Sequence, residues 1–189
     1  MPESAAMALT ATLRRYEISI ADSDRNVYEQ VEWRAAQHPS ETDRYLAARI
    51  VARCLEHAEG LDFTKGLDAD DEPALWQKNL RGEIQSWIEI GSPSTERLHR
   101  ASKTGASVVV YAYKQPDKIL KDAAAFGAHK VESWRVVELD GAFLDRIAQR
   151  TDKVNRWDIA ISGGQLYLTI GKELLESTVT THTTGSLGL

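Results

Sequence analysis

The sequence predicts a mixed α/β (α+β) domain with a helix–strand–strand–strand–helix–strand core over residues 40–113 and an added β-hairpin on each side. Alternating apolar and polar residues predict the two hairpins. Apolar residues at helical spacing follow Ser40, and the β-branched run ASVVVYAY predicts a strand covered on both faces. The chain has 189 residues and shows no repeat or linker, so we expect a single domain over 1–189.

Residues 8–36 are expected to form the first hairpin, because two alternating stretches flank the turn cluster DSDRN. The next helix is expected to begin at Ser40, since Ser40 and Asp43 have the spacing of a capping box. Gly60 is expected to follow its end. Glu41, in the first turn, falls at the edge of the apolar arc. The polar face of this helix is expected to carry Arg49, Arg53, Glu56 and His57.

The central hairpin has a register that the sequence predicts. LDFTKG is a short strand, and ALWQKNL and EIQSWIEIG are two further strands joined across Arg81-Gly82, a good tight-turn pair. If Leu80 pairs with Glu83, Trp76 faces Trp87, and this cross-strand aromatic pair helps to fix the register. The same register brings an acidic loop beside Glu89. That loop contains Asp68, Asp70, Asp71 and Glu72.

The second half of the chain continues with alternating elements. We expect a short helix from about Ser94, the strand ASVVVYAY, a helix over PDKILKDAAAFGAH, the strand VESWRVV and a helix over DGAFLDRIAQRT. A second hairpin, RWDIAISGGQLYLTIG, is expected to turn at Gly163-Gly164. Residues 1–7 and 181–189 are expected to be flexible.

Composition restricts the function classes. The net charge of −5 argues against a broad electrostatic grip on nucleic acid, while a small cationic groove is compatible with it. No apolar run approaches the roughly 18 residues of a membrane helix, and the first residues do not resemble a signal peptide. We therefore expect a cytoplasmic protein with no membrane partner. Cys54 is the single cysteine and the five histidines lack ligand spacing, so a cysteine or histidine metal site is not expected.

Carboxylates are predicted to converge where the second and third core strands meet. Asp71 or Glu72 would lie beside Glu89, and Glu41 would point toward them from the helix start. Mg²⁺ (or Mn²⁺) is held by a few carboxylate oxygens and keeps several waters. Such an ion polarises a phosphoryl oxygen and lowers the pKa of a bound water. The competing interpretations are a solvated acidic loop, an exposed strand residue at Glu89, and a carboxylate that stabilises the first helical turn at Glu41.

The segments HPSET, FTKG, DEPALWQK and WIEIG, with their order and spacing, resemble the YaeQ family from about residue 8 to residue 180. This resemblance implies a variant of the PD-(D/E)xK nuclease fold, the restriction-endonuclease-like core whose element order agrees with the order expected above. It also implies that Glu41 matches the helix glutamate. By the same match, Asp71 or Glu72 corresponds to the aspartate beside proline, and Glu89 to the acidic residue of the third strand.

The chain departs from that family pattern at Gly91, where (D/E)xK has lysine. A lysine there would hold the attacking water or stabilise developing negative charge. Lys78 is the best local substitute, because the expected register puts it on the Glu89 face two pairs away. Lys65 and Lys103 are weaker substitutes.

The leading hypothesis is a Mg²⁺-dependent nuclease-like protein that hydrolyses phosphodiester bonds in nucleic acid. Its catalytic residues would be Glu41, Asp71, Glu89 and Lys78, and its metal ligands Asp71, Glu72 and Glu89. The alternative is a catalytically inactive nuclease-fold module that binds nucleic acid or a protein partner, which the glycine at position 91 and the net charge favour. A third hypothesis is an interaction module that uses the hairpins at 8–36 and 157–170.

A basic run lies on the short helix that follows Glu89. It is either a solvated helix face or, if it flanks the acidic site, a surface that contacts phosphate. Trp76 and Trp87 are expected to be packing residues rather than platforms for stacked bases. The basic run comprises Arg97, His99, Arg100 and Lys103.

Overall fold

The structure is a computed structural model that describes residues 10–65 and 71–189. Residues 1–7, expected to be flexible, and the acidic residues Asp68 and Asp70 lie outside the described residues. In chain order the elements are β1 (Thr12–Asp22), β2 (Val27–Gln37), α1 (Asp43–Leu55), β3 (Leu61–Phe63), β4 (Leu75–Lys78), β5 (Ile84–Ile90), α2 (Thr95–Ser102), β6 (Ser107–Ala112), α3 (Pro116–Phe126), η2 (Val131–Ser133), β7 (Arg135–Glu138), α4 (Gly141–Ala148), β8 (Val154–Ser162), β9 (Gln165–Ile170), β10 (Glu173–Thr178), β11 (Thr180–His182) and η3 (Gly185–Leu187).

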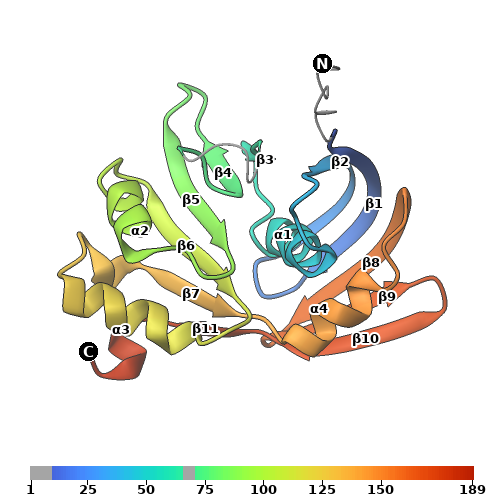
Figure 1. Cartoon of the computed structure of the whole chain (residues 1–189). Helices are drawn as coiled ribbons and strands as arrows, with labels where there is room; N and C mark the ends of the chain where they lie inside the picture. The colour runs from blue at the N-terminus through green and yellow to red at the C-terminus, as the bar shows by residue number, and fades with distance from the viewer. Residues whose placement is uncertain (1–9, 66–70) are drawn as a thin grey trace, which may run out of the picture.

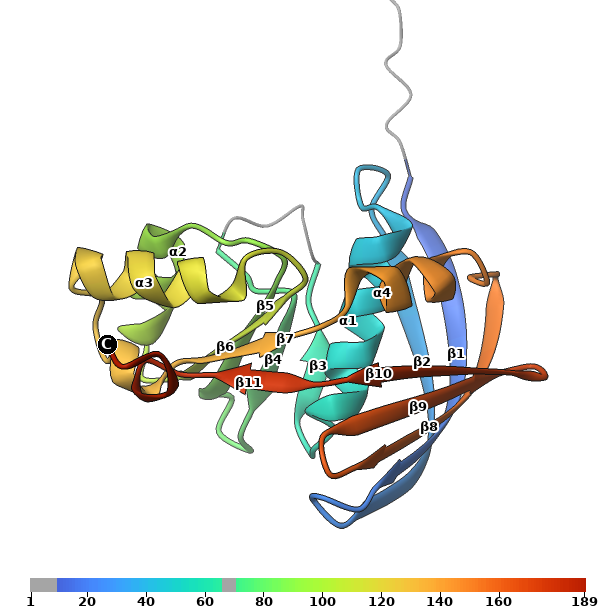
Figure 2. The same ribbon diagram turned by 90° about the horizontal axis from the view of Figure 1, so that it is seen from below.

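Two mixed sheets alternate with helices in four layers (Figures 1 and 2). The six-stranded sheet has the order β11-β7-β6-β5-β4-β3, and the five-stranded sheet has the order β10-β9-β8-β1-β2. Helices α1 and α4 lie between the two sheets, and α2 and α3 cover the opposite face of the six-stranded sheet. This arrangement confirms the mixed α/β class. In the described part of the chain, no helix is long and apolar enough to span a membrane.

Both expected hairpins are present, and they belong to one sheet. In the first, β1 and β2 pair along their whole length, with Tyr16 opposite Trp33. In the second, β8 and β9 pair around Gly163-Gly164. Parallel pairing of β1 with β8 joins the two hairpins. This long-range pairing has no local signal in the sequence.

The central hairpin keeps the expected register over most of its length. Trp76 faces Trp87 as predicted, but a bulge after Gln77 pairs Lys78 with Ile84 instead of Gln85. The turn is also one residue longer than expected, because the N–H of Asn79 donates to the Glu83 carbonyl at 3.0 Å. The three-residue loop 80–82 has Gly82 at φ +81°, the left-handed position that such a loop requires.

Helix α1 begins at Asp43, three residues after the expected Ser40. Its N-cap is Thr42, whose hydroxyl accepts the Tyr45 N–H at 3.1 Å. Ser40 instead contacts the ring of His38. Glu41 therefore lies in the turn before the helix rather than in its first turn, where it was expected.

The expected polar face of α1 is partly buried. Arg49 and Arg53 are only 1% and 9% exposed, because sheets enclose the helix on two sides. The Arg53 guanidinium carbon lies 4.4 Å from the centre of the Trp33 ring and 4.2 Å from that of Phe63. These cation–π contacts replace the hydration that the guanidinium loses.

Two apolar cores flank the six-stranded sheet. Ile88 and Ile90 belong to the core shared with α1 and the five-stranded sheet. Trp87 belongs to the core beneath α2 and α3. Because successive side chains of a strand alternate, Glu89 lies on the α2 face of β5 with Trp87.

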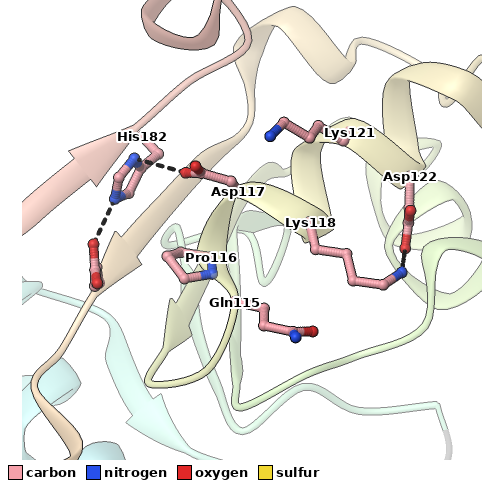
Figure 3. Close-up of a pocket in the computed structure, with 8 residues that line it drawn as sticks. Gln115, Pro116, Asp117, Lys118, Lys121, Asp122 and His182 are labelled. Atoms are coloured by element: carbon pink, nitrogen blue, oxygen red, sulfur yellow. Dashed lines mark hydrogen bonds and ion pairs between the residues drawn. The ribbon is translucent and has the colours of Figure 1, made fainter.

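The C-terminal segment 181–189, expected to be flexible, contains the end of strand β11 and the short helix η3. Strand β11 pairs with β7, and Leu187 packs against the core beneath α3. The ring of His182 lies between two carboxylates, 2.8 Å from Glu138 through Nε2 and 3.3 Å from Asp117 through Nδ1 (Figure 3). Strand pairing and these two contacts hold the segment, which its small, polar composition does not reveal.

Candidate functional site

Glu89, the central residue of the predicted site, lies near the end of β5, which pairs in parallel with β6. Helix α2 follows β5, and helix α3 follows β6. In open α/β sheets, ligands bind outside the carboxyl ends of parallel strands, because the connecting loops leave a crevice there. The side chains around this edge therefore form the candidate site.

Glu89 is a buried carboxylate near the end of β5, with 5% of its surface exposed. Its Oε1 atom accepts hydrogen bonds from Trp87 Nε1 at 2.8 Å and from Arg97 Nε at 2.6 Å. No hydrogen bond among the described residues reaches Oε2. Burial raises the pKa of the Glu89 carboxyl, while the bonds from Trp87 and Arg97 oppose that rise. Glu89 thus has one committed oxygen and one oxygen available to a ligand.

Arg97 connects β5 to the acidic loop. It lies in the first turn of α2, where Ser94 caps the helix. Besides the bond to Glu89, its Nη2 atom donates to the backbone carbonyl of Glu72. Sequence reasoning placed Arg97 in a basic surface run and missed this role. The relevant signal is its position in the first turn of a helix that starts directly after the strand bearing Glu89.

The acidic loop contributes Asp71 rather than Glu72 to this face. The Glu72 carboxylate turns away and accepts the Lys65 N–H at 3.2 Å. Asp71 is exposed and lines a pocket of about 320 Å³ together with Trp87 and Arg97. Trp87 and Arg97, which both donate hydrogen bonds to Glu89, therefore line the same pocket as Asp71.

Glu41 lies on the α1 side. It is 5% exposed, and its Oε2 atom accepts the His38 N–H at 3.2 Å. Arg49 Nη2 is 3.1 Å from Oε1 but approaches off the hydrogen-bond direction, so charge attraction holds this pair. Burial raises the pKa of the Glu41 carboxyl, and Arg49 opposes this. The predicted acidic residues therefore occupy two halves of a site.

Tyr45 on α1 links the two halves electrostatically. Burial is the largest cause of the raised pKa of its phenol, and the charges of Glu89 and Glu41 raise it further. The charges of both carboxylates thus act on the Tyr45 hydroxyl, although no hydrogen bond or ion pair among the described residues joins Glu41 to Glu89. Tyr45 was not predicted as a site residue, because its position on the helix is that of an ordinary packing residue.

The backbone conformation at Gly91 disfavours the lysine that the (D/E)xK pattern has at this position. Its φ of +87° lies in the left-handed region, where a lysine would be strained. A Cβ atom at this position would lie 3.7 Å from the hydroxyl of Tyr113, which follows β6 directly. Burial raises the pKa of Tyr113, so this hydroxyl is protonated at neutral pH and can donate. Tyr113 is a second site residue that sequence reasoning missed.

The lysines proposed as substitutes lie elsewhere. Lys78 Nζ is 3.7 Å from the centre of the Trp76 ring, and the bulge pairs Lys78 with Ile84 near the hairpin turn. Glu89 lies five residues further along the strand than Ile84, about 16 Å at the usual rise per residue. Lys65 and Lys103 are exposed. Lys78 was expected to pair with Gln85 on the Glu89 face. The bulge pairs it with Ile84 instead, one residue nearer the turn.

Comparison with known proteins defines the family. A model of the YaeQ protein family matches residues 7–179. The chain belongs to the YaeQ family. The YaeQ protein of Escherichia coli (strain K12), which carries the description "Uncharacterized protein", is 31% identical over 175 residues, covering 92% of this chain and 97% of the relative. The Salmonella typhi protein is 30% identical over the same length.

Solved YaeQ structures share this fold. The crystal structure of YaeQ from Xanthomonas axonopodis pv. citri superposes with a TM-score of 0.84 at 32% identity, covering 92% of this chain and 99% of the other. The Pseudomonas syringae YaeQ structure also gives 0.84, at 29% identity, and covers 92% and 96% of the two chains. The two-sheet architecture is therefore shared by these YaeQ proteins.

The donor set of this YaeQ site limits how a metal could bind. Within residues 10–65 and 71–189, no three His, Cys, Asp or Glu side chains gather closely enough to enclose a metal ion. The oxygens on the α2 face are Glu89 Oε2 and the exposed carboxylate of Asp71. Such a sparse set suits Mg²⁺, which is commonly held by one or two carboxylates with waters and substrate phosphate oxygens.

Proposed function

We propose that this YaeQ protein is a Mg²⁺-dependent hydrolase of phosphodiester bonds in nucleic acid, built on a PD-(D/E)xK-like core. The order of α1, β3, β4, β5, α2 and β6 agrees with that core. Glu89 on the third strand of this order and Asp71 before the second have the positions that the proposal requires.

One observation carries the proposal. Glu89 is a buried carboxylate at the end of a parallel core strand, and none of its hydrogen bonds within the described chain uses Oε2. A buried carboxylate is costly to keep, so its retention beside an open pocket favours a role in binding or chemistry. Arg97 offsets the cost and orients the carboxylate through Oε1.

Glu89 and Asp71 would hold the metal ion, which when bound supplies polarisation of a phosphoryl oxygen and a more acidic water. The remaining residues act directly. Arg97 fixes the orientation of Glu89, and the Tyr113 hydroxyl lies beside Gly91. Glu41, on the α1 side, contributes negative charge that Arg49 balances.

A Mn²⁺ titration by calorimetry tests this proposal. The wild type is expected to bind about one equivalent, and Glu89→Ala is expected to lose that binding. Glu96→Ala removes an exposed carboxylate from the first turn of α2 and serves as the matched control that keeps binding. Cleavage of a labelled single-stranded oligonucleotide with and without Mn²⁺ then measures turnover. Folded wild-type protein that binds no Mn²⁺ would exclude the metal-dependent mechanism.

A second candidate function is a catalytically inactive module that binds nucleic acid or a protein partner. The Arg97–Glu89 ion pair favours it, because an internal cation already occupies one oxygen of the central carboxylate. Such a module is expected to bind an oligonucleotide with an affinity that falls with salt, and to show no metal-dependent turnover. Binding of neither metal nor oligonucleotide would leave the protein-partner version of this module.

A further inference from the structure

The pocket of about 320 Å³ on the α2 face has a rim and a floor of different chemistry. Its exposed rim includes Asp71, Arg100 and Thr104, and its floor is formed by the buried side chains of Trp87 and Ala101. Ile84 and Arg97, both half-buried, complete the wall. The rim thus carries the carboxylate of Asp71 and the guanidinium of Arg100, and the position of Arg100 above an apolar floor fits an anion that carries an apolar body.

The two arginines of this pocket differ in their partners. Arg97 is committed to Glu89 and to the Glu72 carbonyl. The side chain of Arg100, one helical turn further along α2, makes no hydrogen bond or ion pair with the described residues. Because a guanidinium presents a planar array of donors that suits phosphate, Arg100 is available for an anionic ligand.

The floor is suited to a flat group. Trp87 presents the indole whose N–H bonds to Glu89, and its orientation is fixed by that 2.8 Å contact. Ile84 and Ala101 add small apolar surfaces on either side. An aromatic base lies favourably against such surfaces, and an exposed arginine adds a contact to its phosphate.

We propose that this pocket is a nucleotide subsite, in which a nucleobase lies against Trp87 and Ile84 while the attached phosphate contacts Arg100 at the rim. The inference deepens and rests on the proposed function, because it identifies the ligand as a nucleotide whose base is unpaired. A base inside a duplex cannot enter a pocket of this kind without leaving its stack. The substrate class is accordingly single-stranded nucleic acid or a strand end.

The subsite is physically coupled to Glu89. Trp87 and Arg97, which line the pocket, are the two residues that donate to Glu89 Oε1. A base against Trp87 therefore changes the surroundings of the indole N–H without touching the carboxylate. This makes the Trp87 indole proton a reporter of pocket occupancy that needs no catalytic turnover.

The test is a ¹H–¹⁵N titration of the ¹⁵N-labelled full chain with AMP, adenosine and ribose 5-phosphate. Trp87→Phe assigns the Trp87 signal among the five tryptophans, and the shift caused by Glu89→Gln gives a second assignment. AMP is expected to move the signal saturably, and ribose 5-phosphate to bind at least tenfold more weakly. Arg100→Ala is expected to weaken AMP binding about tenfold, the effect of one charge-assisted contact. The affinity for adenosine, which has no phosphate, should not change.

Lys103→Ala is the matched control, because it removes an exposed cation from the C-cap of the same helix and does not line the pocket. It should bind AMP as the wild type does. Equal affinity for AMP and ribose 5-phosphate, equal losses in the two variants, or an unmoved Trp87 signal at millimolar AMP would each overturn the subsite. Saturable AMP binding without oligonucleotide cleavage would support the subsite and reject hydrolysis. Oligonucleotide cleavage without AMP binding would support hydrolysis and reject the subsite.

Discussion

Arg97 donates its Nε hydrogen to Oε1 of Glu89 at 2.6 Å and thereby balances the one buried carboxylate on the α2 face of β5. We predict that Arg97→Ala lowers the free energy of unfolding by about 1–3 kcal/mol, because it leaves that carboxylate without its cation. Urea denaturation at pH 7 measures the loss. Arg100→Ala on the same helix should stay within about 0.5 kcal/mol of the wild type. Equal losses in the two variants would contradict a specific Arg97–Glu89 interaction.

The raised pKa of Glu89 predicts a stability difference that depends on pH. The native state holds this proton more tightly than the unfolded chain, in which a glutamate titrates near about 4.3. The stability that the proton contributes is therefore complete below about pH 4 and is lost as pH rises through the native pKa. Relative to Glu89→Gln, the wild type should lose stability between pH 4 and pH 7 in urea denaturation. The stability difference between the wild type and the control variant Glu96→Gln should not change over this pH range.

The Glu41–Arg49 pair predicts a strong coupling, because both side chains are only 1% exposed. Arg49→Met should cost about 3–5 kcal/mol, since it leaves an unpaired carboxylate in the core. The double variant Arg49→Met/Glu41→Gln should lose less than the sum of its single variants. A double-mutant cycle by chemical denaturation measures this difference, and strict additivity would show that the two groups do not interact.

His182 predicts a local effect on the C-terminal strand. His182→Ala removes the contacts to Asp117 and Glu138 that anchor β11, and should cost about 1–2 kcal/mol. Amide hydrogen exchange of the β11–β7 pairs should accelerate while the five-stranded sheet keeps its protection. Lys121 lines a pocket together with His182 but makes no hydrogen bond or ion pair with its ring, so Lys121→Ala is the control that should leave exchange unchanged. Protection of β11 that survives in His182→Ala would assign the anchoring to strand pairing and Leu187 alone.

The left-handed backbone at Gly91 predicts that a lysine at this position, as the (D/E)xK pattern of the proposal has it, is unfavourable. Gly91→Ala and Gly91→Lys should each cost about 1–2 kcal/mol, because the strain arises at Cβ and not at the end of the side chain. Thermal and urea denaturation of the two variants measure this. A lysine variant as stable as the wild type would mean that the backbone at position 91 relaxes.

The order of the core elements and the pairing of Trp76 with Trp87 could be predicted, because they depend on local periodicity and on one aromatic pair. The bulge after Gln77 could not, since a loop of two or three residues is compatible with the same alternating pattern. Arg49 and Arg53 were expected on a polar face because helical periodicity shows only which side is most apolar. Their burial comes from strands far away in the chain.

The candidate site was predicted in part. Arg97 bonds both to Glu89 and to the Glu72 carbonyl of the acidic loop, and Asp71 lines a pocket with Trp87 and Arg97. The partners Arg97 and Tyr113 could not be predicted from spacing. Each depends on how a connection leaves its strand, and the side-chain directions there follow from three-dimensional packing. Lys78 was misplaced by the single-residue shift in register.

The parallel pairing of β1 with β8 has a consequence for how the protein is made. The contact between Glu17 and Arg156 joins residues 139 positions apart in the chain. At usual rates of translation, roughly 10–30 s separate the synthesis of these two strands. Throughout that interval β1 has no partner strand on the edge that β8 later occupies. That edge is therefore open to wrong pairing on the ribosome until β8, which begins at residue 154 of 189, emerges to close the sheet.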